Sequence, residues 1–303
     1  MSSKDAALSL GPPPQRITVD AAQVRRLIAD QFPQWAGLPI RPVAKSGWDN
    51  LTFHLGEAML VRLPSAAEYA LAVAKEQRWL PALAPRLPLP VPVPLAQGRP
   101  DADYPFPWSV YRWLPGSAAR PDRIADPVRF ALDLAAFLAA LQRIDAADGP
   151  QPGTHNWFRG GTLRTFDSLV QRAFAALDGH IDVPLAREIW ASALDTPWDG
   201  VETWFHGDMA PGNLLLVDGD LSAVIDFGTC GVGDPSCDLA IAWTLLTPTA
   251  RAAFRRRLAV DDATWARARG WALWKTLVTC ARGDEEAATI LDGILADASQ
   301  AES

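Results

Sequence analysis

The stretch TWFHGDMAPGNLLLVDGDLSAVIDFGTCGVGDPSCDLA, from Thr203 to Ala240, decides how the fold is interpreted. It places charged and amide side chains among runs of leucine, valine and isoleucine. Acidic residues on a solvated surface do not need such apolar neighbours, so these side chains are expected at the mouth of a buried site. The candidates in this stretch are His206, Asp208, Asn213, Asp226, Asp234 and Asp238.

Two apolar segments within this stretch predict a β-hairpin. They cover residues 214–217 and 221–225, and the dipeptide Asp218-Gly219 between them is typical of a two-residue hairpin turn. Antiparallel pairing then brings Asn213 and Asp226 back to the same end of the hairpin. An amide oxygen and a carboxylate are the hard ligands that Mg²⁺ prefers when it also holds phosphate oxygens and water. Asp208 lies on the loop that enters the hairpin, close to this metal site.

The order of these residues resembles the catalytic end of protein-kinase-like phosphotransferases. In those enzymes a D-x-x-x-x-N loop is followed by a D-F-G triplet, and HGDMAPGN with IDFG supplies both here. The glycine in H-G-D, the tail GDPSCDLA and the lack of a long segment between DFG and GDP resemble the aminoglycoside phosphotransferase family of small-molecule kinases. The resemblance implies a two-lobed α+β fold, with an N-terminal antiparallel sheet lobe and a helical C-terminal lobe, and ATP and Mg²⁺ as cofactors.

The resemblance also implies roles for the residues of the motif. Asp208 would be the catalytic base that accepts the proton of the acceptor hydroxyl, and Asn213 and Asp226 would hold Mg²⁺. Taken without the motif, Asp208 would be an ordinary loop acid and Asp226 an ordinary residue at a strand end.

Three further residues would support the loop. His206 would brace it, and a structural histidine is favoured here over a proton donor. Asp234 would cap the next helix, with Pro235 in its first turn, and Asp238 would anchor the catalytic loop from that helix.

The nucleotide-binding lobe shows a looser match. In kinases a lysine on the third strand meets the phosphates and pairs with a glutamate of the next helix. Here the strand AMLVRLP offers Arg62, and Glu76 lies on the apolar face of the following helix. A charge turned inward needs a partner, so we predict an Arg62–Glu76 pair, unless the helix is rotated to expose Glu76. Arginine is not interchangeable with lysine at a phosphate site, and Lys45 and Lys75 are alternative cations.

Two backbone segments complete the predicted nucleotide site. The loop KSGWDN stands where a glycine-rich phosphate cover is expected, and Ser46, Gly47 and Asn50 are its candidate phosphate-binding residues. An ordinary hairpin turn explains this loop equally well. The strand VYRWLPG would be the hinge, with backbone groups from Tyr111 to Trp113 meeting the adenine, or its side chains would only fill the core.

Hydrophobic periodicity predicts a sheet-rich front and a helix-rich back. Residues 1–15 are expected to form a flexible tail, residues 16–115 the N-terminal lobe and residues 116–303 the helical C-terminal lobe. In the first lobe the pattern predicts a short amphipathic helix, antiparallel strands and a helix over 65–83. In the second, Asp126-Pro127 starts a helix, and further helices are expected over 163–177, 184–194 and 263–280 and after Asp234.

Composition excludes several classes of protein. Hydrophobic residues at 49% and charged residues at 21% fit a globular protein rather than a disordered or fibrous one. The apolar runs fall short of the roughly 20 residues that cross a bilayer, and no secretory signal is visible, so a cytoplasmic protein without a membrane partner is expected. The net charge of −7 argues against a nucleic-acid partner. Cys230, Cys237 and Cys280 have no metal-like spacing and are expected in the core.

The leading hypothesis is an ATP-dependent kinase that phosphorylates a hydroxyl of a small molecule, such as an aminoglycoside-like antibiotic. Related families use choline, homoserine, macrolides or sugar amines, so the fold does not choose the acceptor. The segments HNWFRGGTL (155–163) and WARARGWALWK (265–275) are candidates for the acceptor pocket, although core packing explains them equally well. A non-catalytic nucleotide-binding module and a metallohydrolase using His206 are the rival hypotheses.

Overall fold

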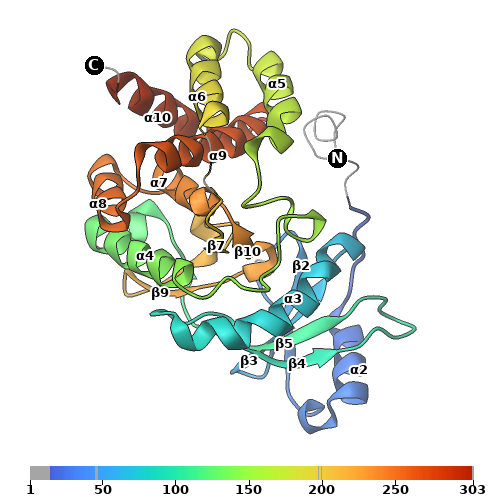
Figure 1. Cartoon of the computed structure of the whole chain (residues 1–303). Coiled ribbons are helices and arrows are strands. Elements are labelled where there is room, and N and C mark those ends of the chain that lie inside the picture. The colour runs from blue at the N-terminus through green and yellow to red at the C-terminus, as the bar shows by residue number, and fades with distance from the viewer. Residues whose placement is uncertain (1–13, 45–46, 197, 199, 302–303) are drawn as a thin grey trace.

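The computed structural model describes residues 14–44, 47–196, 198 and 200–301. The chain forms a small lobe, built on one antiparallel sheet, and a larger helical lobe (Figure 1). Most of the predicted tail, residues 1–13, lies outside the described residues, as do Lys45 and Ser46.

The small lobe contains a five-stranded antiparallel sheet in the order β1-β2-β3-β5-β4. One face of the sheet packs on helix α2 (Ala21–Gln31), whose Val24, Leu27 and Ile28 are buried. Asp20 starts this helix with a capping box, because its side chain accepts from the amide of Gln23. The strands are β1 (Ile40–Pro42), β2 (Asn50–Leu55), β3 (Met59–Pro64), β4 (Pro94–Gly98) and β5 (Trp108–Arg112).

Helix α3 (Ala67–Leu83) connects the two lobes. It follows β3 in the chain, and Leu80 and Leu83 at its end belong to the core of the larger lobe. Its polar residues Lys75 and Glu76 are both buried, which requires partners for two opposite charges. In Figure 1 the helix lies between the sheet and the helical lobe.

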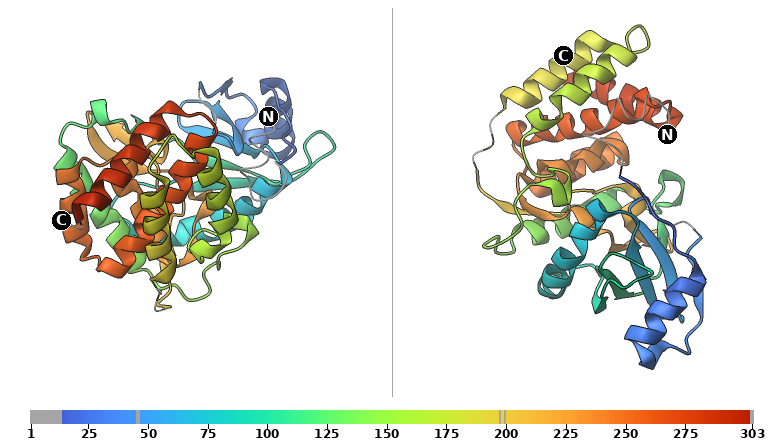
Figure 2. Two further views of the ribbon diagram at one scale, coloured as in Figure 1. Left: turned by 90° about the horizontal axis from the view of Figure 1, so that it is seen from above. Right: turned by 90° about the vertical axis from the view of Figure 1, so that its right-hand side faces the viewer.

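The helical lobe is organised around α9 (Asp262–Ala281), which has buried residues along its whole length. Asp126 caps α4 as expected, with Pro127 at the first helical position. Figure 2 shows α5, α6, α9 and α10 gathered at the end of the molecule opposite the small sheet. The other helices are α4 (Pro127–Gln142), α5 (Asp167–Ala176), α6 (Val183–Asp195), α7 (Ile241–Thr244), α8 (Pro248–Leu258) and α10 (Glu285–Ala301).

Two small sheets hold the motif at the boundary between the lobes. The predicted hairpin is formed by β8 (Leu214–Val217) and β9 (Asp220–Val224), and β6 (Ser117–Ala118) pairs with β8. Its turn residues Asp218 and Gly219 have φ values of 53° and 87°, as a type I′ turn requires. Strands β7 (Thr203–Phe205) and β10 (Gly231–Gly233) form the second small sheet.

The elements agree with the sequence prediction in type, and the differences lie at their ends. The helix expected over 163–177 begins as a 3-10 turn over Leu163–Phe166, and the helix expected after Asp234 is a 3-10 helix, η8 (Pro235–Ala240), followed by α7. Cys230 and Cys237 are buried and unpaired, as expected of core residues, whereas Cys280 is partly exposed. Every helix in the described part of the chain is too short or too polar to span a membrane.

Candidate active site

The hairpin brings Asn213 and Asp226 together, as the spacing predicts. Leu214 pairs with Val224, and the amide of Ile225 donates to the carbonyl of Asn213 at 2.8 Å, so Asp226 lies next to Asn213 at the open end of the hairpin. Asp226 has a φ of 67°, a left-handed conformation that is uncommon outside glycine and often marks a functional site. Both residues line the same cavity.

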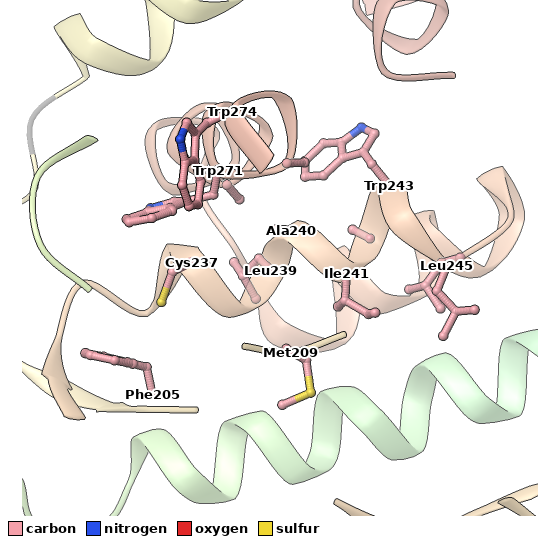
Figure 3. Packing of buried hydrophobic residues seen from close by; sticks show 14 of the residues in the cluster. Phe205, Met209, Cys237, Leu239, Ala240, Ile241, Trp243, Leu245, Trp271 and Trp274 are labelled. Atoms are coloured by element: carbon pink, nitrogen blue, oxygen red, sulfur yellow. The ribbon is translucent and has the colours of Figure 1, made fainter. Parts of the chain in front are cut away.

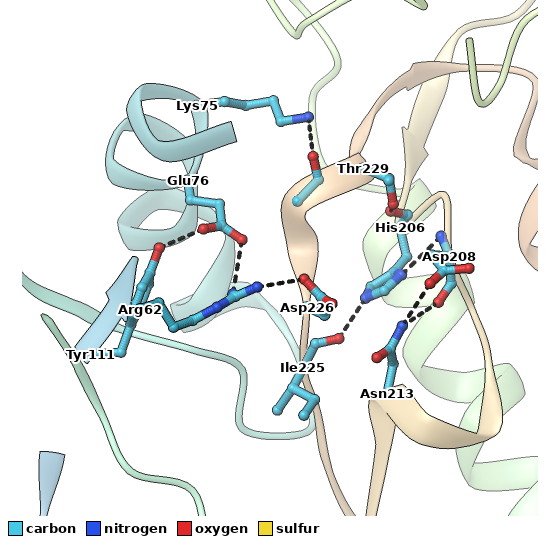
Figure 4. A network of polar contacts seen from close by, with 11 residues as sticks. Arg62, Lys75, Glu76, Tyr111, His206, Asp208, Asn213, Ile225, Asp226 and Thr229 are labelled. Carbon is cyan, nitrogen blue, oxygen red and sulfur yellow. Dashed lines mark hydrogen bonds and ion pairs between the residues drawn. The ribbon is translucent and has the colours of Figure 1, made fainter. Parts of the chain in front are cut away.

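The loop before the hairpin carries Asp208 and is fixed from both sides (Figure 4). Asn213 donates through Nδ2 to the carbonyl of Asp208 at 2.8 Å and to its Oδ2 at 3.1 Å. His206 accepts at Nδ1 from the amide of Asp208 at 3.2 Å, and its Nε2 lies 2.9 Å from the carbonyl of Ile225. A carbonyl can only accept, so the ring is a neutral imidazole with its proton on Nε2. His206 therefore joins the loop to the hairpin.

Asp238 holds the start of the same loop from η8. Its two carboxylate oxygens accept from the amides of His206 and Gly207, each at 2.7 Å. The side chain is fully buried. Burial raises the pKa of Asp238, and the hydrogen bonds from the backbone amides of His206 and Gly207 partly oppose this rise.

The glycine of the H-G-D motif is required by backbone conformation. Gly207 has a φ of +86°, and a Cβ placed on it would lie 2.5 Å from the carbonyl oxygen of Thr229. Any side chain at this position would therefore push the catalytic loop away from the segment after Asp226.

Sequence reasoning missed Lys275 as an individual residue, because it named only the segment 265–275. Its Nζ on α9 lies 2.7 Å from Oδ1 of Asp208. Burial alone would raise the pKa of Asp208, but Lys275 and then Arg159 outweigh it and lower this pKa to about 2. Asp208 is thus a carboxylate at neutral pH, held between Lys275 and Asn213.

The structure contains the predicted Arg62–Glu76 pair, with 3.4 Å between Nη1 of Arg62 and Oε1 of Glu76. The same guanidinium also contacts Asp226 through Nη2 at 2.7 Å, and the hydroxyl of Tyr111 donates to Oε2 of Glu76. Burial alone would lower the pKa of Arg62, but the carboxylates of Asp226 and Glu76 raise it. Arg62 therefore joins β3, α3 and the end of the hairpin through the separate nitrogens of one planar group.

The structure excludes Lys75 as a substitute for Arg62. Its buried Nζ donates to the carbonyls of Gly228 at 2.8 Å and Cys230 at 3.0 Å, and it lies 3.1 Å from Nδ1 of His155. Lys75 and Glu76 are neighbours on a helix, so their side chains leave it in directions about 100° apart. Lys75 points into the segment that follows Asp226. The other alternative cation, Lys45, lies outside the described residues.

The loop between β1 and β2 adds an acid that the sequence did not single out. Asp49 lines the same cavity as Gly47, Asn50 and Arg62. Burial, and then the nearby Asp226, raise the pKa of Asp49 to about 7. Gly47 and Asn50 thus lie where a phosphate cover was expected, while Ser46 is outside the described residues.

Two backbone amides of the predicted hinge already have hydrogen-bond partners. The amide of Arg112 donates to the carbonyl of Val93 at 3.1 Å, and the amide of Trp113 donates to the carbonyl of Ala58 at 2.8 Å. Within the described residues, the next amide, that of Leu114, has no partner, and Leu114 lines the cavity. These two amides of the predicted hinge are therefore used by backbone pairing.

Two cavities meet at the catalytic loop. The first, which we call the nucleotide cavity, measures about 270 Å³ and lies between the sheet and the hairpin. The second, the acceptor cavity, measures about 310 Å³ and lies between the catalytic loop and helices α9 and α10. The nucleotide cavity is lined by residues that include Asp49, Arg62, Tyr111, Trp113, Asn213 and Asp226, and the acceptor cavity by Arg159, Asp208, Met209, Trp271, Trp274 and Lys275.

The residues at the end of the hairpin fit a magnesium ion that is also bound by phosphates. Asn213 uses its Nδ2 for Asp208, and Asp226 uses Oδ1 for Arg62. Among the described residues, Oδ1 of Asn213 and Oδ2 of Asp226 have no hydrogen-bond partner. Nowhere in the described residues do three or more His, Cys, Asp or Glu side chains form a group that could hold a metal ion by themselves. One carboxylate and one amide oxygen, completed by phosphates and water, suit Mg²⁺.

Asp234 has a larger role than capping. Its Oδ1 accepts from the amide of Ser236, as an N-cap does, and its Oδ2 accepts from Nε of Arg267 at 2.7 Å. Both side chains of this ion pair are buried. Asp234 therefore ties η8, and through it Asp238, to α9.

Known structures share this fold at low sequence identity. The GDP complex of wild-type aminoglycoside 2'-phosphotransferase-IIIa is 17% identical, covers 93% of this chain and 100% of its own, and has a TM-score of 0.67. The streptomycin–ATP ternary complex of APH(2")-IIa is 16% identical, with 94% and 97% coverage and a TM-score of 0.60. Macrolide 2'-phosphotransferase MphH from Brachybacterium faecium, as the apoenzyme, is 22% identical, with 91% and 97% coverage and a TM-score of 0.58.

These similarities confirm the two-lobed, protein-kinase-like α+β fold. No curated protein matches the chain. The model of the phosphotransferase enzyme family matches residues 40–271, which include the small sheet, the hairpin and the first half of α9. Since this match extends over well more than half of the sequence, the chain belongs to the phosphotransferase enzyme family.

Proposed function

We propose that this protein transfers the γ-phosphoryl group of ATP to a hydroxyl of a small molecule. One observation carries the proposal. Asp208 lines the acceptor cavity and is hydrogen-bonded to Asn213, which lines the nucleotide cavity. A hydroxyl bound beside Asp208 would thus face the end of a nucleotide bound beside Asn213. Phosphoryl transfer needs mainly such positioning and charge compensation from the protein.

Asp208 would orient the acceptor hydroxyl and take its proton. With a pKa of about 2 the carboxylate is ionised throughout the neutral range, so it is always ready to accept. A weak base suffices because the transition state is loose and the hydroxyl becomes acidic only as it bonds to phosphorus. His206 would have no proton-transfer role, since both its ring nitrogens are used by the backbone.

The nucleotide would lie between the N-terminal lobe, residues 16–115, and the C-terminal lobe, residues 116–303. Leu114 would offer its amide to the adenine base. It directly follows the predicted hinge segment that contains Tyr111 and Trp113. Arg62, with Glu76 behind it, would meet the phosphates under the loop that contains Gly47 and Asn50. Asn213 and Asp226 would hold Mg²⁺, which would neutralise charge on the phosphates.

The acceptor class is the open part of this proposal. The related structures include complexes with kanamycin, streptomycin and gentamicin, and macrolide phosphotransferases. An aminoglycoside-like antibiotic is one candidate acceptor, and a metabolite such as choline, homoserine or a sugar amine is the alternative. The filled positions Asp208, Asn213 and Asp226 favour a catalyst over a non-catalytic nucleotide-binding module.

Acceptor-stimulated ADP release tests the proposal. A panel of hydroxyl-bearing antibiotics and metabolites is assayed with MgATP. Replacement Asp208→Ala is expected to lower turnover by roughly 10² to 10⁴ while ATP binding is kept. Replacement Asp226→Ala is expected to abolish turnover at every Mg²⁺ concentration. The exposed hairpin residue Asp220 provides the matched control, and Asp220→Ala is expected to behave as wild type. Equal turnover in Asp208→Ala would reject the proposed role, and phosphate release without any acceptor would favour a hydrolase.

A further inference from the structure

The acceptor cavity has an unusual distribution of charge. Its wall on α9 is apolar where Trp271 and Trp274 line it (Figure 3), and two cations, Arg159 and Lys275, also line the cavity. Besides Asp208, the carboxylates that line the cavity are those of Asp284 and Glu286 at the start of α10. Both of these residues are exposed, and Asp284 caps the helix by accepting from the amide of Ala287 at 2.9 Å. Asp284 and Glu286 are therefore solvated acids at the start of α10, whereas Arg159 and Lys275 line the cavity beside Asp208.

Arg159 is a partly buried cation that forms no ion pair within the described residues. Its Nε donates to the carbonyl of Gly207 at 3.0 Å, and its guanidinium carbon lies 4.6 Å from the centre of the Trp274 ring. Within the described residues it forms no ion pair, and its two Nη groups have no hydrogen-bond partner. Burial lowers the pKa of Arg159, and Asp208 only partly opposes this effect. A guanidinium in such surroundings favours a bound anion.

Lys275 is the second cation of the wall. It pairs with Oδ1 of Asp208, yet 44% of its side chain remains exposed to the cavity and its surroundings. An ammonium group has three donors, and one of them is used by Asp208. The inner wall thus offers free donors on both sides of Asp208. A protonated amino group of an acceptor would face other donors there and would be repelled. Carboxylate or phosphate oxygens could accept hydrogen bonds from Arg159 and Lys275.

We propose that the acceptor of the phosphotransferase activity inferred above carries an oxyanionic group, a carboxylate or a phosphate, that binds Arg159 and Lys275 beside the hydroxyl. The inference rests on that proposed function, because it assigns the acceptor to the cavity that contains Asp208. It implies that a polycationic acceptor is disfavoured at the inner wall, where Asp208 is the only lining carboxylate among the described residues and is already paired with Lys275.

An oxyanion at this place has two conceivable sources, the acceptor itself and the phosphoryl group in transit. The lining residues favour the acceptor. Arg159 lines the acceptor cavity and not the nucleotide cavity, where Arg62 already meets Asp226. Its fixed contact with Gly207 and its stacking on Trp274 hold the guanidinium on the acceptor side of the loop.

The inference is tested by calorimetry on the full chain saturated with MgADP. D-Gluconate, D-glucose and D-glucosamine serve as acid, neutral and cationic probes of one carbon skeleton. Gluconate is expected to bind at least about 10-fold more tightly than glucosamine, since a charge-assisted contact has this strength. Arg159→Met is expected to remove that preference, and Arg159→Lys to restore part of it. The exposed Arg164, which pairs with Asp195, gives the control Arg164→Met, with the preference kept.

Three outcomes would overturn the inference. The first is tighter binding of glucosamine than of gluconate, and the second is no measurable binding of gluconate. The third is an Arg159→Met variant that binds gluconate as wild type does but loses affinity for the MgADP–fluoroaluminate complex, because Arg159 would then serve the transferred group. Binding of MgADP by wild-type protein is measured in the same experiment, so a failure of the proposed nucleotide site would be recognised separately.

Discussion

Lys275 of α9 and Asp208 of the catalytic loop form an ion pair at 2.7 Å across 67 positions of sequence. Without the ammonium, the largest cause that lowers the pKa of Asp208 is lost, and this pKa is expected to rise from about 2. The acidic limb of the pH–rate profile of Lys275→Met is therefore expected to lie at higher pH than that of wild type. Rates of ADP release measured as pH falls from 8 would locate this limb for both proteins.

The same pair also predicts a change in stability. Because the folded pKa of Asp208 lies below the ordinary 3.8, its ionisation stabilises wild type above about pH 4, and this contribution is lost as pH falls towards 2. Lys275→Met would lack it, and Lys275→Arg, which keeps the charge, is the control. Identical pH–rate profiles for Lys275→Met and wild type would show that Lys275 does not act on Asp208.

Replacement of Arg62 by lysine, the residue of protein kinases, is expected to impair this protein. The guanidinium contacts Glu76 through Nη1 and Asp226 through Nη2, and an ammonium would have to reach both carboxylates from a single nitrogen. We expect MgATP affinity to fall about tenfold in Arg62→Lys, as for the loss of one charged hydrogen bond. In Arg62→Met the MgATP affinity should fall further. The melting temperature should also fall, because among the described residues Glu76 would keep only Tyr111 as a side-chain partner. Unchanged MgATP affinity in Arg62→Lys, measured by calorimetry, would contradict the assigned role.

Asp49 is expected to destabilise the nucleotide-free protein at alkaline pH. Burial and Asp226 raise its folded pKa to about 7 from 3.8, so the folded state holds a proton that the unfolded state releases. The sign follows from linkage, and stability falls as pH rises from about 4 through 7. Asp49→Asn should therefore melt at a higher temperature than wild type at pH 8 and at a similar one at pH 4. Thermal unfolding at low salt, with Asp220→Asn as an exposed control, would reveal an error if both variants matched wild type at pH 8.

Gly207→Ala is expected to damage both stability and turnover. The new Cβ would lie 2.5 Å from the carbonyl oxygen of Thr229, and the φ of +86° disfavours any L side chain. We expect a loss of about 1–3 kcal/mol in the free energy of unfolding, measured with urea, together with reduced turnover from displaced Asp208. Gly37→Ala is a suitable control, since Gly37 is exposed outside both cavities and a Cβ there meets no atom within 4 Å. A fully active and stable Gly207→Ala would show that the loop tolerates the displacement.

Local spacing explains which parts of the site could be predicted from sequence. The hairpin turn alone places Asn213 beside Asp226, because antiparallel pairing is determined by residues next to one another in the chain. The Arg62–Glu76 contact followed from one buried charge that needed a partner on the adjacent strand. In the first case the partner is close in sequence, and in the second only a few cations could be the partner.

The remaining site residues depend on how distant helices pack. Lys275 lies in a segment where tryptophan and arginine recur, and the pattern does not say which cation turns towards the catalytic loop. Arg159 and Asp49 lie in loops whose course follows from tertiary contacts. In the predicted hinge, the amides of Arg112 and Trp113 donate to the carbonyls of Val93 and Ala58, and these partners cannot be assigned from the strand's own sequence.

Lys75 has a consequence for the motion of the two lobes. Its buried ammonium group attaches α3 to Gly228 and Cys230 of the larger lobe, beside His155. Moving α3 away from the larger lobe would break these contacts together, so we expect the helix to stay with that lobe. We then expect an opening that admits a nucleotide to displace the strands β1 and β2 relative to α3.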